Sequence, residues 1–310
     1  MNPKYPLVSI VTPSYNQGRY LERTIESVLE QNYPNLDYII IDGGSTDESV
    51  EIIKKYERFL KYWVSEPDRG QSHAINKGFK HATGELLTWL NSDDIYMPGA
   101  LHKLVELAVD NPQASVFVGA GRIVNADGKV SYYKEPNTEI DIETLYLWMS
   151  SGNFMQPSSL FRREAWDKAG PVDETVHIAF DLDLWLRMAK QGCRFISTPE
   201  LLSTALGHNE AKTQLFVHWM TIDLAIVIMK HGGKEAAVRP RLEDMARRLS
   251  MYEPNFAKII NHPLYKILMP VIKLFIKPAV RWRDTLPQWS APQTKTKPLE
   301  PPLDNEKQRS

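Results

Sequence analysis

The most constraining feature of this sequence is a series of short apolar runs that alternate with amphipathic stretches over about the first 120 residues. Val8–Thr12, Asp37–Ile41, Tyr62–Ser65 and Leu86–Leu90 are apolar or β-branched runs of strand length, which indicates buried strands. Between these runs, apolar residues recur at helical spacing. Strands that alternate with helices predict right-handed βαβ units, so we expect an α/β fold with a mostly parallel sheet flanked by helices.

The pattern changes after residue 120. Asn125-Ala126-Asp127-Gly128 lies between two alternating runs and predicts a hairpin, and Phe180–Lys190 predicts an amphipathic helix. We therefore expect four segments: residues 1–120 as the first half of the main domain, 121–213 as its mixed second half, 214–285 as a helical extension, and 286–310 as a disordered tail rich in Pro, Lys, Gln and Glu.

Composition narrows the class of protein. The chain has 310 residues, of which 43% are hydrophobic and 24% charged, as in soluble globular proteins. A net charge of −1 indicates no overall attraction to nucleic acid. The single cysteine, Cys193, cannot form an internal disulfide, which favours a reducing compartment and a structural role. With no signal peptide or long uncharged apolar stretch in the sequence, we expect a cytoplasmic protein.

Polar residues follow each of the first four predicted strands. These are Thr12-Pro13-Ser14-Tyr15-Asn16, Asp42-Gly43-Gly44-Ser45-Thr46-Asp47, Glu66-Pro67-Asp68-Arg69-Gly70 and Asn91-Ser92-Asp93-Asp94. In open parallel sheets, ligands bind where the carboxyl ends of the strands meet. Taken singly, each of these loops has a composition that is common in turns. Together they place carboxylates on one rim, where they repel one another unless a cation such as Mg²⁺ or Mn²⁺ is present. In the second loop, Ser45 and Thr46 also stand where helix N-caps are expected.

The sequence lacks the loops that define two classes of nucleotide-binding protein. A dinucleotide-binding Rossmann domain requires G-x-G-x-x-G after the first strand, where this chain has Pro13-Ser14-Tyr15-Asn16. A nucleotidyltransferase would require a phosphate loop rich in glycine and lysine at the same place. Neither motif occurs there.

Four segments in order resemble the family 2 glycosyltransferases, which have the GT-A fold. They are VSIVTPSYNQGRYLERTIESVLEQNYPNLDYIIIDGGSTD, EPDRGQSHAINKGFKHATGELLTWLNSDD, QPSSLFRREAWDKAGPVDE and DLDLWLRMA, within about residues 6–213. The resemblance implies a GT-A type, Rossmann-like sheet and an inverting transfer of a sugar from a nucleotide-diphospho-sugar, UDP-sugar above others. The acceptor would be a hydroxyl of a glycan or lipid-linked molecule in surface polysaccharide or glycolipid synthesis. The alternative is a non-catalytic nucleotide-sugar-binding protein.

The resemblance also implies a nucleotide site. In the segment GQSHAINKG, this chain has His73 where the related G-x-x-D-A-x-N-K-G pattern of the family usually has Asp. The implied contacts are Thr12, Pro13 and Tyr15 at the uracil or ribose, Asp42 at the base, Asp68 and Arg69 at the base and diphosphate, and Ser92 and Asp93 from the NSDD segment.

A divalent metal, Mg²⁺ or Mn²⁺, is implied by the same resemblance. The NSDD segment corresponds to the family's D-x-D, with Asn91 in place of its first acid. This makes Asp93 the expected metal ligand, with Asp94 beside it. His208 and Lys212 lie in GHNEAKT, which resembles the family's H-x-x-x-K-[ST] loop, although Leu and Gly replace the residues that usually precede the His. His208 would reach the metal or the diphosphate, or would be a surface histidine.

The catalytic base is implied to be Asp181, at the start of the predicted helix Phe180–Lys190. The acid that usually precedes it is replaced by Phe180. Asp183 is expected to be an exposed or capping carboxylate. Gln156 would contact the donor sugar or serve a structural loop, and Trp185 would pack in the core or stack on the acceptor.

Residues 263–283 interleave five cations with large apolar side chains. This composition suits an amphipathic helix on an anionic membrane surface, at the inner face of the membrane. The alternative is a helix packed on the catalytic domain.

Overall fold

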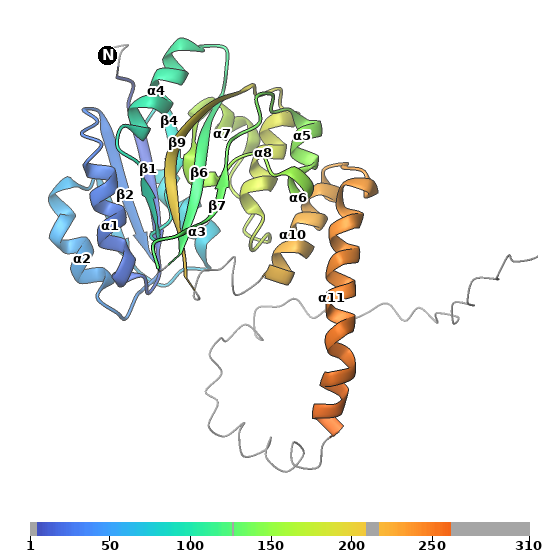
Figure 1. The fold of residues 1–310 in the computed structure, drawn as a ribbon. Coiled ribbons are helices and arrows are strands. Elements are labelled where there is room, and N and C mark those ends of the chain that lie inside the picture. Colours follow the sequence, from blue (N-terminus) through green and yellow to red (C-terminus); the bar gives the residue numbers. More distant parts are fainter. Residues whose placement is uncertain (1–4, 126, 209–216, 262–310) are drawn as a thin grey trace, which may run out of the picture. The chain divides into compact units, whose positions relative to one another are not determined.

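The computed structural model describes residues 5–125, 127–208 and 217–261 (Figure 1). The chain divides into two compact units, residues 1–249 and 250–310. The first unit contains the sheet and its helices. Within the described residues, no helix combines the length and hydropathy needed to cross a membrane. The predicted tail and the segment 263–283 lie outside the described residues.

The bounds of the elements are as follows. The strands are β1 (Val8–Ser14), β2 (Leu36–Asp42), β3 (Tyr62–Ser65), β4 (Leu86–Trp89), β5 (Asp94–Tyr96), β6 (Val116–Asn125), β7 (Val130–Lys134), β8 (Ser159–Arg162) and β9 (Phe195–Gly207). The α-helices are α1 (Gly18–Leu29), α2 (Ser49–Tyr56), α3 (Gln71–His81), α4 (Ala100–Asp110), α5 (Ile142–Tyr146), α6 (Trp148–Ser151), α7 (Arg163–Ala169), α8 (Phe180–Lys190), α10 (Val217–Lys230) and α11 (Glu235–Asn261).

The nine strands of the described residues form one sheet, in the order β3-β2-β1-β4-β8-β6-β9-β5, with β7 beside β6. The first four strands are parallel, which confirms the predicted βαβ half. β8 then lies antiparallel between β4 and β6, and β9 is parallel to β6. The expected α/β class with a mixed second half is therefore confirmed. The hairpin predicted around Asn125 is also present, as β6 and β7.

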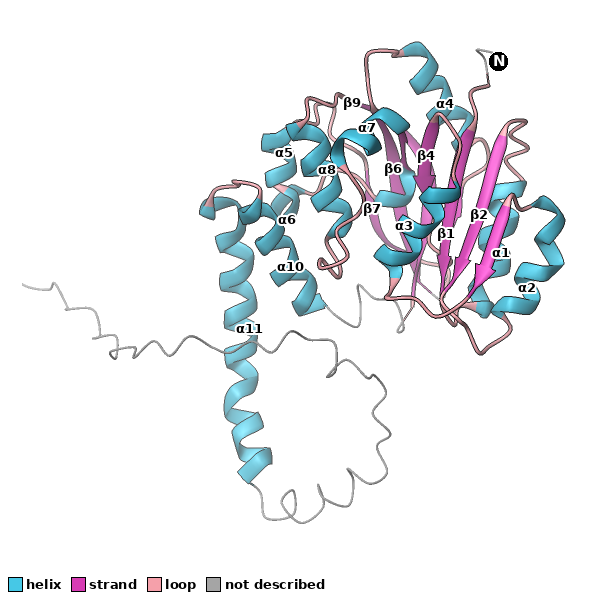
Figure 2. Ribbon diagram, turned by 180° about the vertical axis from the view of Figure 1, so that it is seen from behind, coloured by secondary structure: helices cyan, strands magenta, loops and turns pink. Residues whose placement is uncertain are grey.

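Helices cover both faces of the sheet, as Figures 1 and 2 show from opposite sides. Alternate residues of a strand point to opposite faces. In β1, Val8 and Ile10 pack with α1, α2 and α4, whereas Val11 packs with α3 and α8 on the other face. Because both faces are covered, the central strands are apolar throughout, which is why they read as continuous apolar runs.

The start of α2 differs from the expectation that Ser45 and Thr46 cap it. The helix begins at Ser49, and Asp47 Oδ1 accepts hydrogen bonds from Ser49 N (3.1 Å) and Oγ (2.6 Å). Asp47 Oδ2 accepts from Gly18 N (2.9 Å), at the start of α1. One carboxylate thus joins the positive ends of two helices. Burial raises the pKa of Asp47, but these hydrogen bonds outweigh it and lower the pKa below its usual value.

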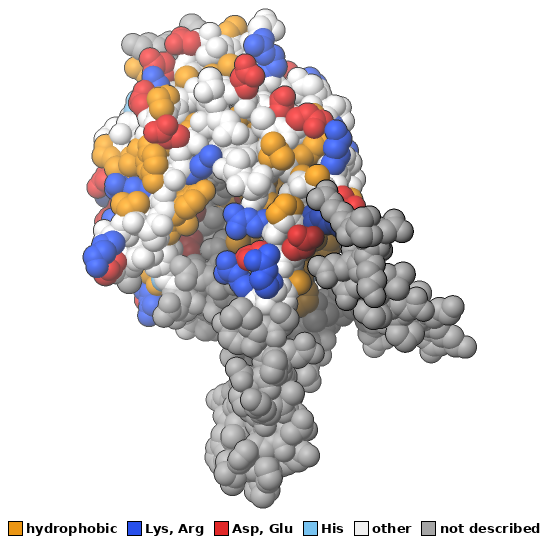
Figure 3. Space-filling model, turned by 45° about the vertical axis from the view of Figure 1, so that its right-hand side comes forward, with side chains coloured by type: hydrophobic (Ala, Val, Ile, Leu, Met, Phe, Trp, Pro, Cys, Tyr) orange, Lys and Arg blue, Asp and Glu red, His pale blue; other side chains and the backbone are white. Residues whose placement is uncertain are grey.

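The described part of α11 is a charged surface helix. Arg239 pairs with Glu235 and Glu243, and Arg248 pairs with Asp244, all at i,i+4 spacing. On the face shown in Figure 3, basic and acidic side chains lie next to one another rather than in separate patches. Exposed pairs of this kind each contribute only about 0.3–0.5 kcal/mol.

We expect Gly78→Ala to destabilise the protein. Gly78 lies where α3 packs on the sheet, and an added Cβ would overlap the side chain of Val11. Overpacking costs about 1–3 kcal/mol, which exceeds the roughly 1 kcal/mol that Ala gains over Gly in a helix. The free energy of unfolding in urea should therefore fall. Lys80→Ala, at an exposed position of the same helix, should change it by less than about 0.5 kcal/mol. Equal stability of wild type and Gly78→Ala would contradict this packing.

Candidate active site

The loops after β1 and β2 are joined by hydrogen bonds at the carboxyl ends of the strands. Asn16, with a φ of 51°, donates from its backbone N to Ser45 Oγ (2.8 Å), and its Oδ1 accepts from Thr46 N (2.9 Å). Tyr15 projects from this joined pair of loops and is 61% exposed. A flat ring on a fixed loop can stack on a base, which suits the contact with uracil or ribose that the resemblance implies for Tyr15.

Thr12 and Pro13 lie deeper than Tyr15. Both are buried in β1, and Thr12 Oγ1 shares a hydrogen bond with the Tyr38 hydroxyl (3.1 Å). The Thr12 side chain is therefore occupied inside the sheet. Its predicted contact with a nucleotide, and that of Pro13, stays a prediction.

Asp42 ends β2 and is fully buried. Its Oδ2 accepts hydrogen bonds from Ser45 N (2.8 Å), Gly44 N (3.2 Å) and Ser65 Oγ (2.6 Å), and its Oδ1 accepts from Ser45 Oγ (2.5 Å). An ionised carboxylate has about four acceptor positions, so most of its capacity is used within the protein. In this conformation Asp42 shapes the loop, and a contact with a base would require some of these bonds to rearrange.

Asp68 lies opposite Gly43, at the end of β3. Its carboxylate atoms are 3.0–3.3 Å from the position that a Cβ on Gly43 would take. Gly43 thus makes room for Asp68, whose Oδ1 accepts from Gly70 N (2.7 Å). Burial raises the pKa of Asp68, and the nearby charge of Asp42 adds to this. Asp42 and Asp68 are brought together as predicted from their strand ends.

Arg69 has a partner within the protein. Its guanidinium pairs with Glu174 Oε2 at 2.7 Å, and its predicted contact with a nucleotide stays a prediction. Its backbone N donates to His73 Nδ1 (3.3 Å), which gives this unusual histidine a local structural role. Glu174 also accepts from Asn76 Nδ2 (3.2 Å). These contacts bring the segment between α7 and α8 to the rim of the sheet.

Asp93 and His208, which are 115 residues apart, are brought together. Asp93 Oδ2 lies 3.1 Å from His208 Nε2, and the His208 ring lies over Tyr20 of α1 with 4.4 Å between centroids. Asp94, by contrast, is buried in β5 and accepts from Asn91 Nδ2 (3.0 Å). Burial, together with the charge of Asp93, raises its pKa well above the usual value. The expectation that Asp94 assists Asp93 at the metal is therefore not supported by its position.

The NSDD segment is held by α1 and α3. Thr24 Oγ1 donates to the carbonyls of Ser92 (2.9 Å) and Asp94 (2.8 Å), and Ser92 is itself buried. Asn91 Oδ1 accepts from Gln71 Nε2 (2.7 Å) while its Nδ2 donates to Asp94. An amide can do both, whereas an ionised carboxylate only accepts. This is a physical reason for Asn where the family pattern has an acid.

The described residues contain no group of three or more His, Cys, Asp and Glu side chains that could hold a metal. Asp93 offers two carboxylate oxygens, and His208 offers a ring nitrogen when that nitrogen carries no proton. Mg²⁺ usually keeps several waters and takes phosphate oxygens from the substrate, with only one or two protein carboxylates. This pair therefore fits a divalent cation that is bound together with a diphosphate.

Asp181 lies in the first turn of α8, next to a residue that packs on the end of β4. Phe180 is buried with its ring 6.3 Å from that of Trp89, the last residue of β4. Gln156, also buried, donates from Nε2 to the Trp89 carbonyl (2.8 Å). Trp89 thus links the predicted base, the predicted sugar contact and the NSDD segment. Sequence reasoning did not single it out, and its place at the end of a buried strand is the one signal it offered.

Trp185 is not open to an acceptor. It is fully buried and stacks on Trp89, with 5.8 Å between centroids and 12° between planes. The core alternative for this residue is therefore correct, and acceptor stacking is not. The cause is that α8 packs its apolar side against the sheet.

The expectation that Asp183 is an exposed or capping carboxylate is wrong. It is fully buried rather than exposed, and it contacts Arg187 Nε (2.8 Å), Lys230 Nζ (3.1 Å) and His231 Nε2 (2.9 Å). Burial by itself raises the pKa of Asp183, but hydrogen bonds from His231 and Arg187 outweigh it and hold the pKa well below its usual value. Lys212 lies outside the described residues.

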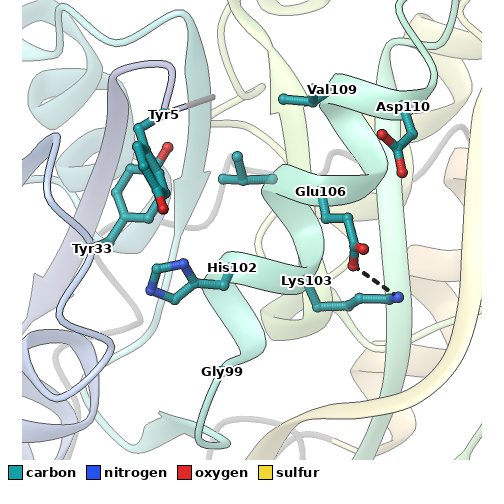
Figure 4. Close-up of a pocket in the computed structure, with 9 residues that line it drawn as sticks. Tyr5, Tyr33, Gly99, His102, Lys103, Glu106, Val109 and Asp110 are labelled. Carbon is teal, nitrogen blue, oxygen red and sulfur yellow. Dashed lines mark ion pairs between the residues drawn. The ribbon is translucent and has the colours of Figure 1, made fainter. Parts of the chain in front are cut away.

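A separate hollow of about 510 Å³ lies away from these residues (Figure 4). Tyr5 and Tyr33, which precede β1 and β2, line one side, and α4 lines the other. Figure 4 shows His102 beside the two tyrosine rings. The hollow is thus at the amino ends of the strands, opposite the rim described above.

Comparison with known proteins gives the family. The family model described as glycosyl transferase family 2 matches residues 9–170, just over half of the chain. This chain belongs to glycosyl transferase family 2. The match spans β1 to α7, and so includes Asp42, Asp68, Asp93 and Gln156 but not Asp181 or His208.

Relatives and solved structures agree with this family. A Bacillus subtilis protein provisionally named as a teichuronic acid biosynthesis glycosyltransferase is 37% identical over 117 residues, 37% of this chain and 46% of the relative. The chain spans about a third to three fifths of the length of other curated glycosyltransferase relatives.

Two solved structures share the GT-A fold, which confirms the expected fold. S. aureus TarS 1–349 in complex with UDP has a TM-score of 0.54 at 18% identity, covering 85% of this chain and 77% of TarS 1–349. The mannosyltransferase PcManGT of Pyrobaculum calidifontis, in complex with GDP-Man and Mn²⁺, has a TM-score of 0.51 at 19% identity, covering 88% of each chain.

We expect Asp42→Asn to destabilise the family 2 domain. The amide NH₂ would face donors that now bind a carboxylate, and an unsatisfied buried group costs about 1–3 kcal/mol. The free energy of unfolding in urea should fall by this amount. Asp110→Asn, the same change at an exposed position of α4, is the control and should alter it by less than about 0.5 kcal/mol. If both variants match wild type, the bonds to Asp42 do not stabilise the loop.

Proposed function

We propose that this chain is a metal-dependent, inverting glycosyltransferase that moves a sugar from a nucleotide-diphospho-sugar to an acceptor hydroxyl. The observation that carries this proposal is the grouping around the end of β4. Trp89 contacts Gln156 and Phe180, next to Asp181, and the NSDD segment with the Asp93–His208 pair follows the same strand. Family membership supports the same activity.

The donor would bind across the rim. Tyr15 would stack on the base, and Asp42 and Asp68 would accept from the base or ribose. A divalent cation at Asp93 and His208 would neutralise the charge of the departing diphosphate. The preference for UDP is supported by the TarS complex with UDP, and the need for a metal by the PcManGT complex with GDP-Man and Mn²⁺. Both remain proposals for this chain.

In the proposed transfer, Asp181 is the base. The acceptor oxygen attacks the anomeric carbon, the bond from that carbon to the diphosphate oxygen breaks, and the acceptor proton passes to the Asp181 carboxylate. Attack opposite the leaving group inverts the anomeric configuration. Such a positioned base contributes about 10²- to 10⁴-fold. Gln156, held by Trp89, would contact the donor sugar from the same side.

The acceptor is proposed to be a glycan or lipid-linked molecule of a cell-surface polymer, made at the cytoplasmic side of the membrane. The relative named for teichuronic acid biosynthesis supports this assignment. We also propose that residues 1–120 form the donor half and 121–213 the acceptor half of one domain. The extension at 214–285 would associate with the membrane through its segment 263–283.

A non-catalytic nucleotide-sugar binder is the second candidate. Asn91 favours it, because the metal motif lacks its first acid and the amide is used within the protein. Turnover separates the two candidates, since both would bind a nucleotide.

We expect Asp181→Asn to abolish transfer without loss of nucleotide binding, because the amide cannot accept the proton. Release of nucleoside diphosphate from a panel of UDP- and GDP-sugars with Mn²⁺ should fall by at least about 100-fold. Stabilisation by UDP in a thermal-shift assay should persist. Asp167→Asn, at an exposed position of α7, should keep wild-type turnover. Full activity of Asp181→Asn would refute the assigned base, and no turnover by wild type would favour the binder.

We expect His208→Ala to weaken metal binding in the presence of nucleotide. With UDP held constant, the Mn²⁺ concentration that gives half-maximal thermal stabilisation should rise by about tenfold or more, because one of two protein ligands is lost. Asp93→Asn should act in the same direction. His102→Ala, at the opposite end of the strands, should leave the Mn²⁺ titration unchanged. An unchanged titration for His208→Ala would remove His208 from the metal site.

A further inference from the structure

α10 contacts the segment that leads to Asp181, although it lies beyond the residues matched by the family model. Lys230, the last residue of α10, reaches both Asp173 Oδ2 (2.9 Å) and Asp183 Oδ1 (3.1 Å). Asp223, in the middle of α10, accepts from the backbone N of Ile178 through Oδ2 (2.9 Å). One helix thus holds the segment between α7 and α8 and also the buried carboxylate of α8.

Other elements hold the first part of the same segment. Arg187 of α8 donates to the carbonyls of Ala169 and Gly170, the latter at 3.0 Å. Asn76 of α3 binds both backbone groups of Val172, each at 2.9 Å. The beginning of the segment is therefore fixed by α8 and α3, and Asp223 fixes its end.

The hydrogen bond from Ile178 N to Asp223 matters at the end of the segment because α8 has no side-chain cap. Its N-cap residue is Ala179, whose methyl group cannot accept a hydrogen bond. Helices usually fix their first turn through a Ser, Thr, Asp or Asn at this position. Here the carboxylate of Asp223 binds the amide of the residue just before the N-cap. This places a fixed point three residues before Asp181.

We propose that Asp223 is a positioning residue for the transfer reaction, and that it sets the direction from which α8 presents Asp181 to the acceptor. The proposal rests on the proposed role of Asp181 as the base. The proposed role of Asp223 is indirect, through its hydrogen bond to Ile178 N. A shift of about 1 Å at a reacting group, caused by a distant change, can cost about 100-fold in rate.

We expect substitution of Asp223 to leave binding of the donor unchanged. The residues of the proposed donor site lie elsewhere in the fold: Asp42 ends β2, Asp68 lies in the loop after β3, Asp93 follows β4 and His208 follows β9. The described contacts of Asp223 include none of these four residues. Loss of its carboxylate should therefore lower kcat and leave the KM for the donor unchanged. Because a loss of folded protein would also lower the apparent kcat at constant KM, turnover is referred to the concentration of folded protein, measured by circular dichroism.

Three variants of the full chain test this proposal. Asp223→Ala removes the acceptor for Ile178 N, and Asp223→Asn keeps an oxygen that can accept it. Ile226→Ala changes an exposed side chain of the same helix and is the matched control. Hydrogen–deuterium exchange of peptides that contain Ile178 is the first measurement. Exchange should become about threefold to tenfold faster in Asp223→Ala only, in line with the loss of one hydrogen bond.

Nucleoside diphosphate release from the most active sugar donor is the second measurement. We expect kcat to fall about tenfold to 100-fold in Asp223→Ala, with unchanged donor KM, and to recover in Asp223→Asn. Unchanged exchange at Ile178, or faster exchange with unchanged kcat, would overturn the proposal. A rise in donor KM with constant kcat would also overturn it.

Asp181→Asn separates this inference from the proposed function. If Asp181→Asn is inactive and Asp223→Ala is fully active, the base assignment stands and the positioning role fails. If Asp181→Asn is fully active, the base assignment fails, and the positioning role fails with it.

Discussion

The stacking of Trp89 in the core is the interaction on which the arrangement of the site depends. Its indole lies at the end of β4, fully buried, against Trp185 and Phe180 of α8, and its carbonyl accepts from Gln156. Protein interiors are close-packed, so a large ring in this place leaves its neighbours little freedom. The body of the helix that carries the predicted base is therefore fixed by core packing, and the turn that carries Gln156 is joined to the same place through the Trp89 carbonyl.

The parallel half of the sheet could be predicted from the sequence because its signals are local. β1, β2, β3 and β4 are apolar runs bounded by turn residues, and α1 and α3 repeat apolar residues at helical spacing. β5 and β8 were not predicted. β5 has three residues and β8 has four, too few for a period to show. β8 also pairs antiparallel between two strands from other parts of the chain, which no local pattern encodes.

The residues of the candidate site also differ in whether local sequence signals predict their positions. The strand-end rule predicts that Asp42 and Asp68 lie together, whereas the resemblance left His208 either at the metal or diphosphate or at the surface, and the structure puts it beside Asp93. The burial of Asp183 could not be foreseen, because its partners Lys230 and His231 lie 47 and 48 residues further along the chain. Asn91 read as a weakened metal motif, whereas the structure uses it as a link between Gln71 and Asp94. In both cases the chemistry of a residue was decided by partners that sequence spacing does not reveal.

The close approach of Asp68 to Gly43 has a consequence for how such sequences diverge. A Cβ at position 43 would lie 3.0–3.3 Å from the Asp68 carboxylate atoms, so that the carboxylate would have to give way by a few tenths of an ångström. A side chain at position 43 is therefore accommodated best where the residue at position 68 is shorter or its loop lies further away. The two positions are 25 residues apart in the chain. Among related chains, a substitution at one should nevertheless accompany a substitution at the other, because the two side chains compete for the same space.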